Sequence, residues 1–361
     1  MMPDAPACQE LLALAAPVPV AVIIVAYNND DDVLACLNSL INMSVRPVCI
    51  AVIDNSDIDT MLSEELDTFC KKHALLLQDA IEKSNNCYIV YKRHANGGFA
   101  SANNFAITML KHQEDIEYFW LLNPDTIVTQ NALHTLIKTV QEDVNIGAVG
   151  STLVRMDNSS CIQAAAGSRF NRWFGTTTSL LDGVHLQSIH KYSIADINSG
   201  LDYITGASML VRKKVFETAG VLDERFFLYL EDTEWGIRVK KYGYSLAWAP
   251  ESIVYHKDGG STRPAYADYL MLRNRLLLLR IHYPLYIATA VASYGVVIIR
   301  RILRGQAKRI PLVCQALIDG LRGKQGRPDF IWLQRFDYND GGKIGMPTGR
   351  SAFWKPGGRP A

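Results

Sequence analysis

The stretch that decides the fold lies near the start of the chain, where residues 20–26 read VAVIIVA and run into Tyr27-Asn28-Asn29-Asp30. Such a run of apolar and mostly β-branched residues is typical of a strand that is buried on both faces. Strands of this kind belong to parallel sheets, because helices cover both sides of such sheets. The stretch therefore predicts the first strand of an α/β sheet, with polar residues at its carboxyl end.

The same pattern recurs three times along the chain. The apolar stretches are 48–53, before Asp54-Asn55-Ser56; 88–91, before Asn96-Gly97-Gly98; and 118–122, before Asn123-Pro124-Asp125. Helical patterns lie between them, and this order predicts a doubly wound fold, whose ligands bind outside the carboxyl ends of the strands. We expect one α/β unit up to about Thr262, with the polar strand ends converging on one site.

Composition excludes several classes of protein. The 361 residues carry 37 Lys and Arg against 36 Asp and Glu, a net charge of +1, whereas domains that wrap nucleic acid are strongly basic. The seven cysteines are scattered without a C-x-x-C pair, which disfavours a disulfide scaffold or zinc ribbon and favours a reducing compartment. The apolar N-terminal run has acidic flanks, so no signal peptide is predicted.

The C-terminal part of the chain differs from the rest. Residues 285–299 form an apolar stretch of about 15 residues, where a spanning helix needs ~20. Residues 300–327 hold eight basic residues against one acidic residue, so the rest of the chain has a net charge of −6. An apolar helix beside a basic segment is typical of attachment to an anionic membrane surface; whether it spans or lies on the membrane stays open. The predicted organisation is an N-terminal extension over 1–17, a catalytic domain over 18–262, and a helical, membrane-associated region and tail over 263–361.

Carboxylates at strand ends are the first candidates for chemistry. Asp125 ends an apolar strand, which suits a hard divalent cation that bridges two phosphates, and His256 at another strand end would complete the coordination. A capped turn and an ordinary structural histidine are the alternative interpretations. Asp54 can accept hydrogen bonds from a base or a ribose, although a turn role is commoner for a lone Asp.

Two further strand ends favour a nucleotide. Tyr27 and Asn28 would frame the base and the diphosphate, with turn formation as the alternative. Asn96-Gly97-Gly98 precedes a helix, where backbone N–H groups bind anions at the positive helix end, although a simple Gly-Gly turn explains the same residues.

An acidic cluster, Glu231-Asp232-Thr233-Glu234, follows the aromatic run 226–230. Helix capping explains one or two of its carboxylates, and a general base explains why the cluster follows an aromatic run. No G-x-G-x-x-G follows a strand, and no P-loop or G-x-S-x-G motif occurs, which disfavours dehydrogenases, P-loop proteins and α/β-hydrolases.

Taken together, these segments resemble glycosyltransferase family 2, and most of all its bacterial rhamnosyltransferase-type branch. The segments are VAVIIVAYNN, Asp54-Asn55-Ser56, Asn96-Gly97-Gly98-Phe99-Ala100 with Asn103-Asn104, Asn123-Pro124-Asp125, Thr205-Gly206-Ala207, Glu231-Asp232-Thr233-Glu234-Trp235 and the stretch 256–262, and Arg273-Asn274-Arg275 extends the match to about residue 282. The resemblance implies a GT-A fold, a nucleoside-diphosphate-sugar donor, Mg²⁺ or Mn²⁺, and inversion at the anomeric carbon.

The resemblance also implies roles for single residues. Tyr27, Asn28 and Asp54 would hold the nucleotide base and the diphosphate, and Asn96, Gly97, Gly98 and Asn123 would line the donor site. Asp125 and His256 would bind the metal. Asp232 would be the general base, assisted by Glu231 and Glu234. Position 123 is Asn where the D-x-D form of the motif has a carboxylate. The metal is therefore expected to be held mainly by Asp125, His256 and the donor diphosphate.

The branch implies rhamnose from a dTDP donor, and a saccharide or lipid-linked saccharide acceptor in bacterial surface polysaccharide synthesis. The expected location is cytoplasmic, peripheral to the inner membrane. One alternative is a catalytically inactive, membrane-associated interaction protein on a transferase fold. Another is a sugar-nucleotide nucleotidyltransferase, which is disfavoured because the loop after the first strand is acidic instead of glycine-rich and basic.

Overall fold

The computed structural model describes residues 17–57, 60–78, 86–257, 264–329, 332–333 and 335–336. The chain divides into two compact units. The described residues of Met1–Arg169, Ser179–His256 and Gln325–Arg327 form the first unit, and those of Phe170–Thr178, Lys257–Lys324 and Pro328–Ala361 form the second. The domain boundaries at 17/18 and 262/263 stay a prediction.

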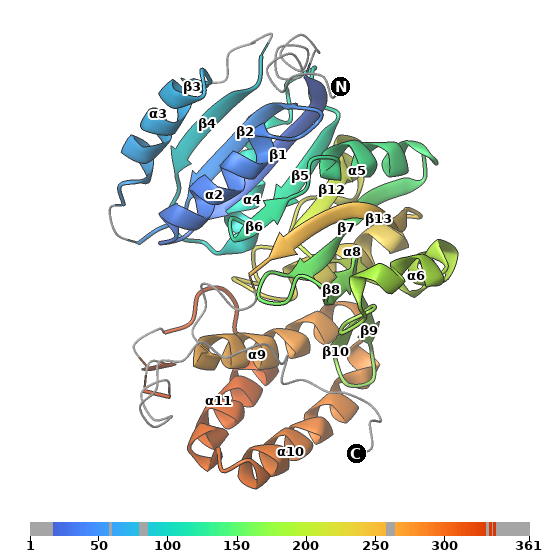
Figure 1. Ribbon diagram of the computed structural model, residues 1–361. Helices are drawn as coiled ribbons and strands as arrows, with labels where there is room; N and C mark the ends of the chain where they lie inside the picture. The colour runs from blue at the N-terminus through green and yellow to red at the C-terminus, as the bar shows by residue number, and fades with distance from the viewer. Residues whose placement is uncertain are drawn as a thin grey trace. The chain divides into compact units, whose positions relative to one another are not determined.

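The first unit is built on a mostly parallel sheet, as the sequence predicts (Figure 1). Its parallel half has the strand order β3-β4-β2-β1-β5, with bounds Leu76–Gln78, Tyr88–Arg93, Pro47–Asp54, Val18–Ala26 and Tyr118–Leu122. The order continues with β12 (Ser208–Arg212), β7 (Ile146–Arg155), β13 (Ser245–His256) and β6 (Thr126–Val128), while β8 (Ile162–Ala165) also pairs with β7. Strand β12 is antiparallel to both neighbours, β13 is parallel to β7, and β6 is antiparallel to β13.

Strand β1 is buried on both faces, which confirms the prediction from residues 20–26. Val20, Val22 and Ile24 belong to one hydrophobic cluster, and Ala21 and Ile23 belong to a second. The first cluster includes apolar side chains of α2 (Asp30–Ile41), α3 (Leu62–Lys72) and α5 (Ala132–Gln141). The second includes those of α4 (Phe99–Leu110), α6 (Ile194–Gly200), α7 (Lys213–Ala219) and α8 (Glu231–Lys241). Helices therefore cover both faces of the sheet.

The polar composition of residues 157–199, with several Gly and Ser, predicts loop and short hairpin, but the structure there is more regular. They hold β8, β9 (Gly167–Asn171), β10 (Thr176–Ser179), the 3₁₀ helix η1 (Leu186–Lys191) and α6, and β9 pairs with β11 (Tyr203–Ile204) in a small sheet of order β10-β9-β11. The sequence analysis did not predict α3, β3 or β6. Two of these are strands of three residues, and the signal available for α3 was the spacing of Leu62, Leu66 and Cys70.

The second unit is helical. It contains α9 (Pro264–His282), η2 (Pro284–Tyr286), α10 (Ile287–Leu303), η3 (Ala307–Arg309) and α11 (Ile310–Leu321). Helices α9 and α11 approach closely at Gly320, where a Cβ atom would lie 2.8 Å from the side chain of Leu276. Within the described chain, Pro284–Leu303 is the one segment long and apolar enough to cross a membrane by length and composition, and 17% of its apolar 18-residue stretch is buried.

Candidate active site

The predicted metal-binding residues meet at the carboxyl ends of β5 and β13. The turn Asn123-Pro124-Asp125 leads from β5 into β6, whose Thr126 pairs with His256 at the end of β13. As a result, Oδ1 of Asp125 lies 3.4 Å from Nε2 of His256, and both side chains are largely buried. Nδ2 of Asn123 lies 3.4 Å from the same ring nitrogen.

Gln163 of β8 orients His256. Its Oε1 lies 2.9 Å from Nδ1 of the histidine. Because an amide oxygen only accepts hydrogen bonds, Nδ1 is the donor in this pair, and Nε2 is the ring nitrogen on the side of Asp125 that could bind a metal. A carboxylate oxygen and an imidazole nitrogen that face each other fit a divalent cation, and metal-binding histidines are usually oriented by such a second hydrogen bond. Nothing in the sequence pattern distinguished Gln163.

The protein contributes few metal ligands at this position. Among the described residues, no group of three or more His, Cys, Asp and Glu side chains is arranged to hold a metal ion. The pair Asp125 and His256 therefore fits a cation only if other ligands, such as phosphate oxygens, complete its coordination.

The acidic cluster stands at the start of α8, after two strained residues. Tyr229 and Leu230 have φ values of 71° and 70°. Residues other than glycine rarely adopt this left-handed region, at a cost of order 1–3 kcal/mol each, and such strain clusters at functional sites. The strained pair sets the direction in which α8 begins, and the sequence held no signal for it.

Asp232 is linked to the metal-binding turn through a dipeptide. Its Oδ2 accepts a hydrogen bond from the backbone N–H of Gly206 at 3.1 Å, and its Oδ1 accepts one from the N–H of Thr233 at 2.6 Å. The carbonyl of Ala207, the next residue, accepts a hydrogen bond from the N–H of Asn123 at 3.0 Å. The dipeptide Gly206-Ala207 therefore connects the predicted base to the turn that holds Asp125.

The two adjacent carboxylates have raised pKa values. Burial raises the pKa of Glu231 well above its usual range, and the charge of Asp232 raises it further. Burial also raises the pKa of Asp232, against the opposing effect of its hydrogen bonds from Gly206 and Thr233. Oε2 of Glu231 is buried without a hydrogen-bond partner. Buried carboxylates with raised pKa values are typical of acid–base sites.

Glu234 has a different environment. Its carboxylate accepts hydrogen bonds from Nε and Nη2 of Arg238 at 3.0 and 2.8 Å. The ion pair joins consecutive turns of α8, and Arg238 also donates to the carbonyl of Val221 at 2.8 Å. Glu234 thus fixes the helix to the loop before it.

Asp54 is satisfied inside the protein. It is fully buried, its Oδ1 accepts a hydrogen bond from the N–H of Ser56 at 2.9 Å, and its Oδ2 accepts one from the hydroxyl of Tyr91 at 2.9 Å. Asn28, with φ of 51°, donates its N–H to Oγ of Ser56 at 3.0 Å. Asp54 and Asn28 therefore shape the turns after β2 and β1.

Asp57 is the more accessible carboxylate at this end of β2. It accepts hydrogen bonds from the hydroxyl of Tyr27 at 3.1 Å and from Nδ2 of Asn96 at 3.4 Å. Arg327 donates to both of its oxygens, and these hydrogen bonds lower the pKa of Asp57. The sequence analysis did not single out Asp57, although it stands three residues after Asp54 in the same strand-end turn.

Gly98 is required for a close approach of two backbone segments. Its φ is +91°, and a Cβ atom there would lie 1.7 Å from the carbonyl oxygen of Phe227. That oxygen accepts a hydrogen bond from the N–H of Phe99 at 3.0 Å, and Oδ1 of Asn96 accepts one from the N–H of Gly98 at 3.2 Å. At Gly97, a Cβ atom would lie 2.6 Å from Oγ of Ser101. The two glycines therefore allow α4 to begin at the site.

A mostly parallel sheet that is covered by helices on both faces, with polar residues at its carboxyl ends, is the architecture of the GT-A glycosyltransferase fold. The family model described as "Glycosyl transferase family 2" matches residues 21–218, more than half of the chain. The chain belongs to that family.

Its relatives include rhamnosyltransferases. The chain is 28% identical to "Rhamnosyltransferase WbbL" of Escherichia coli (strain K12) over 240 residues, which cover 66% of this chain and 83% of the relative. It is 25% identical to "dTDP-rhamnosyl transferase RfbF" of Shigella flexneri over 323 residues, which cover 84% of this chain and 96% of the relative. These relatives support the rhamnosyltransferase-type branch of the family.

Two solved structures share the fold. GalNAc-T7 with UDP, GalNAc and Mn²⁺ matches with a TM-score of 0.55 at 15% identity, over 88% of this chain and 56% of that one. The mannosyltransferase PcManGT from Pyrobaculum calidifontis, in complex with GDP-Man and Mn²⁺, matches with a TM-score of 0.51 at 13% identity, over 88% of this chain and 94% of that one. At these identities the similarity concerns the fold alone.

Proposed function

We propose that the protein is an inverting, metal-dependent glycosyltransferase that moves rhamnose from a dTDP donor to a saccharide or lipid-linked saccharide acceptor in bacterial surface polysaccharide synthesis. The observation that carries the proposal is the link from Asp232, through Gly206 and Ala207, to the turn that brings Asp125 to His256. The name of the Shigella flexneri relative, a dTDP-rhamnosyl transferase, supports the donor.

In this proposal Asp232 is the general base. An acceptor hydroxyl has a pKa far above 7, so a positioned carboxylate must take its proton as the oxygen attacks the anomeric carbon. The bond from the sugar to the diphosphate breaks, and its electron pair leaves with the nucleoside diphosphate. A single displacement of this kind inverts the anomeric configuration. Glu231, with its strongly raised pKa, holds its proton to a higher pH than an ordinary Glu, so Asp232 ionises beside a neutral neighbour.

Asp125 and His256 would hold Mg²⁺ or Mn²⁺, with Asn123 in place of a further carboxylate. When bound, the cation supplies positive charge against the diphosphate of the donor. Gln163 keeps Nε2 of His256 available as a ligand through the hydrogen bond to Nδ1. The residues that we propose around the nucleotide are Tyr27, Asn28, Asp54, Asn96, Gly97, Gly98 and Asn123.

A thermal-shift screen of the full-length protein tests this proposal. We expect dTDP-rhamnose to raise the Tm with Mn²⁺ and to have little effect without it, because a ligand that binds only the native state stabilises it by mass action. UDP- and GDP-sugars serve as controls for the base. Stabilisation by a nucleoside triphosphate with a sugar phosphate instead would favour a nucleotidyltransferase, and no shift with any sugar nucleotide would favour an inactive interaction protein.

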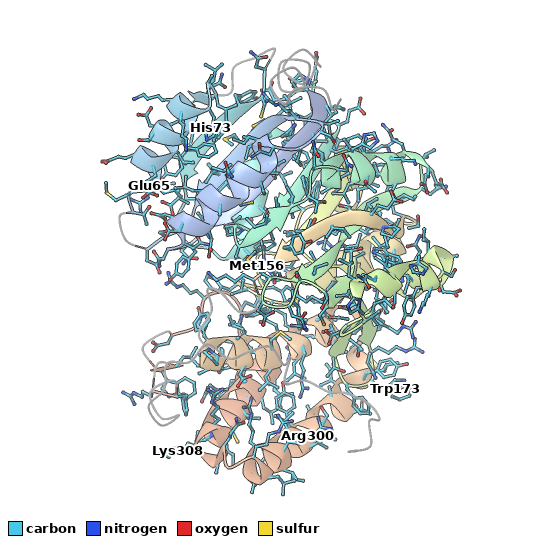
Figure 2. The ribbon with its side chains drawn as sticks, in the orientation of Figure 1. Glu65, His73, Met156, Trp173, Arg300 and Lys308 are labelled. Carbon is cyan, nitrogen blue, oxygen red and sulfur yellow. The ribbon has the colours of Figure 1, made fainter. Side chains whose placement is uncertain are left out.

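We also propose that α10 lies on an anionic membrane surface at the cytoplasmic face of the inner membrane. Apart from Arg300, its exposed side chains are apolar and recur mostly at intervals of three or four residues: Ala288, Ala292, Val296, Ile299, Ile302 and Leu303. Arg300 and Lys308, labelled in Figure 2, are exposed on α10 and just after it. Exposed apolar residues flanked by basic residues are typical of a helix that binds anionic lipid.

The double variant Ile299→Glu, Ile302→Glu is expected to lower binding to vesicles that contain phosphatidylglycerol by about 100-fold or more, because each isoleucine loses ~1.5–3 kcal/mol of apolar burial in the lipid. Cosedimentation measures this binding. Both side chains are exposed, so the Tm should change little. Val144→Glu, at an exposed valine of the first unit, is the matched control. Unchanged cosedimentation of the double variant would contradict surface attachment, and resistance of the wild type to alkaline extraction would indicate a spanning helix.

A further inference from the structure

The segment Gln325–Arg327 belongs to the first unit, although it follows the helices of the second unit in sequence. Gly326 has φ of +68°, and its N–H donates a hydrogen bond to the carbonyl of Arg225 at 3.0 Å. The guanidinium of Arg327 then meets Asp57 in a bidentate pair, with Nη1 2.8 Å from Oδ1 and Nη2 2.5 Å from Oδ2. Cζ of Arg327 also lies 5.9 Å from the ring centroid of Phe227.

This arginine completes a network at the proposed nucleotide site. Asp57 accepts hydrogen bonds from Tyr27 and Asn96 as well as from Arg327. Tyr27 follows β1, Asp57 follows β2 and Asn96 follows β4, three neighbouring strands of the sheet. The guanidinium of Arg327, 270 residues away from Asp57 in sequence, therefore joins a hydrogen-bond network of side chains that follow three strands.

The pair is better suited to positioning than to stability. The side chains of Arg327 and Asp57 are 40% and 36% exposed, and exposed ion pairs contribute little to the stability of the fold. A bidentate contact does, however, fix the direction of the carboxylate, because the planar guanidinium donates two parallel hydrogen bonds. Lysine, with a single ammonium group, does not reproduce this geometry.

We infer that Arg327 is a positioning residue of the donor site, which holds Asp57 and through it Tyr27 and Asn96 in the arrangement that binds the nucleoside of the donor. The inference rests on the proposed function, since it concerns the same nucleotide site. It extends that site to a residue near the C-terminal end of the described chain, outside residues 21–218 that match the family model. A contrary role is also testable: Arg327 would instead block the site if its removal tightened nucleotide binding.

The experiment uses the full-length wild type and the variants Arg327→Ala, Arg327→Lys, Asp57→Asn and Arg327→Ala/Asp57→Asn. Titration calorimetry with dTDP and Mn²⁺ gives the Kd, and turnover of dTDP-rhamnose gives KM and kcat. We expect Arg327→Ala to raise the Kd for dTDP and the donor KM by about 10-fold, with kcat within about threefold and the Tm unchanged. Lysine should restore the binding only partly. Asp57→Asn should have an effect of similar size, and the double variant should be no weaker than the weaker single variant, because both substitutions break the same contact.

Arg225→Ala is the matched control, because Arg225, whose side chain is 47% exposed, forms a bidentate pair with Asp223 two residues away. Its Kd for dTDP should equal that of the wild type. A wild-type or lower Kd in Arg327→Ala, a loss confined to kcat, or additive effects in the double variant would overturn the inference while leaving the proposed function intact. If the wild type bound no nucleoside diphosphate, the proposed function would fail, and the inference would fail with it.

Discussion

Replacing Asp232 by Asn is expected to lower kcat by about 10²–10⁴-fold and to leave the Kd for dTDP and the Tm close to those of the wild type. The amide has nearly the shape of the carboxylate and keeps one of the two oxygens that accept from the N–H groups of Gly206 and Thr233, so the fold should persist with the loss of one hydrogen bond. It cannot take a proton from the acceptor. Steady-state kinetics with the donor, together with calorimetry and thermal unfolding, separates chemistry from binding.

The pH profile sharpens this prediction. A base must be ionised to act, and burial raises the pKa of Asp232. On acidification, kcat of the wild type should therefore begin to fall at a higher pH than it would for an ordinary Asp, whose pKa is about 4. The Asp232→Asn variant should lose this acidic limb. Glu234→Gln is the control: it weakens the pair with Arg238, so it should lower the Tm and leave the limb in place. Near wild-type turnover of Asp232→Asn would exclude Asp232 as the base.

The second large effect is expected at Asp125. Asp125→Asn removes the negative charge of one of the two proposed protein ligands, and we expect turnover at low Mn²⁺ concentration to fall by about 10²-fold or more. The concentration of Mn²⁺ that gives half-maximal activity should rise. Activity as a function of Mn²⁺ concentration measures both quantities.

Gln163→Ala is the companion variant, because it keeps both ligands and removes only the hydrogen bond that orients His256. Loss of such a partner weakens metal binding by about 10–100-fold, so saturating Mn²⁺ should restore its rate. Full activity of the wild type in EDTA, or an unchanged Mn²⁺ dependence in Asp125→Asn, would refute the metal role.

The fold could be predicted because the constraint on β1 is strong. A run in which every residue is apolar can be buried only between two layers, and Val20 and Ala21 indeed face different hydrophobic clusters. Short elements carry no such constraint. Strands β3 and β6 have three residues each, so their pairing depends on the neighbouring strands and not on their own composition.

The site residues that follow strands could be predicted from the sequence, and those that reach the site from other parts of the fold could not. Parallel strands bring their carboxyl ends to one edge, which is why Asp125 and His256 meet. Gln163 reaches the histidine only because β8 pairs with β7, and Arg327 reaches Asp57 only because the chain returns to the first unit. Contacts of this kind are set by tertiary structure and leave no periodic signal in the sequence.

Several basic residues of the C-terminal segment form ion pairs within the protein. Arg301 and Arg309 are buried and form ion pairs with Asp268 at 2.5 and 3.0 Å, and Arg327 pairs with Asp57. Part of the positive charge counted in the sequence is therefore paired with carboxylates of the protein itself. Arg300 and Arg304 are exposed, and in the proposed attachment to the membrane they would be the residues that contact anionic lipid.

The most direct test of the central claim is to incubate the full-length protein with dTDP-rhamnose, Mn²⁺ and a lipid-linked saccharide acceptor, and to follow the release of dTDP and the anomeric configuration of the product by NMR. We predict Mn²⁺-dependent release of dTDP that is matched by a product of inverted configuration. Retention of configuration, equal release in EDTA, or no transfer from any sugar nucleotide would contradict the account.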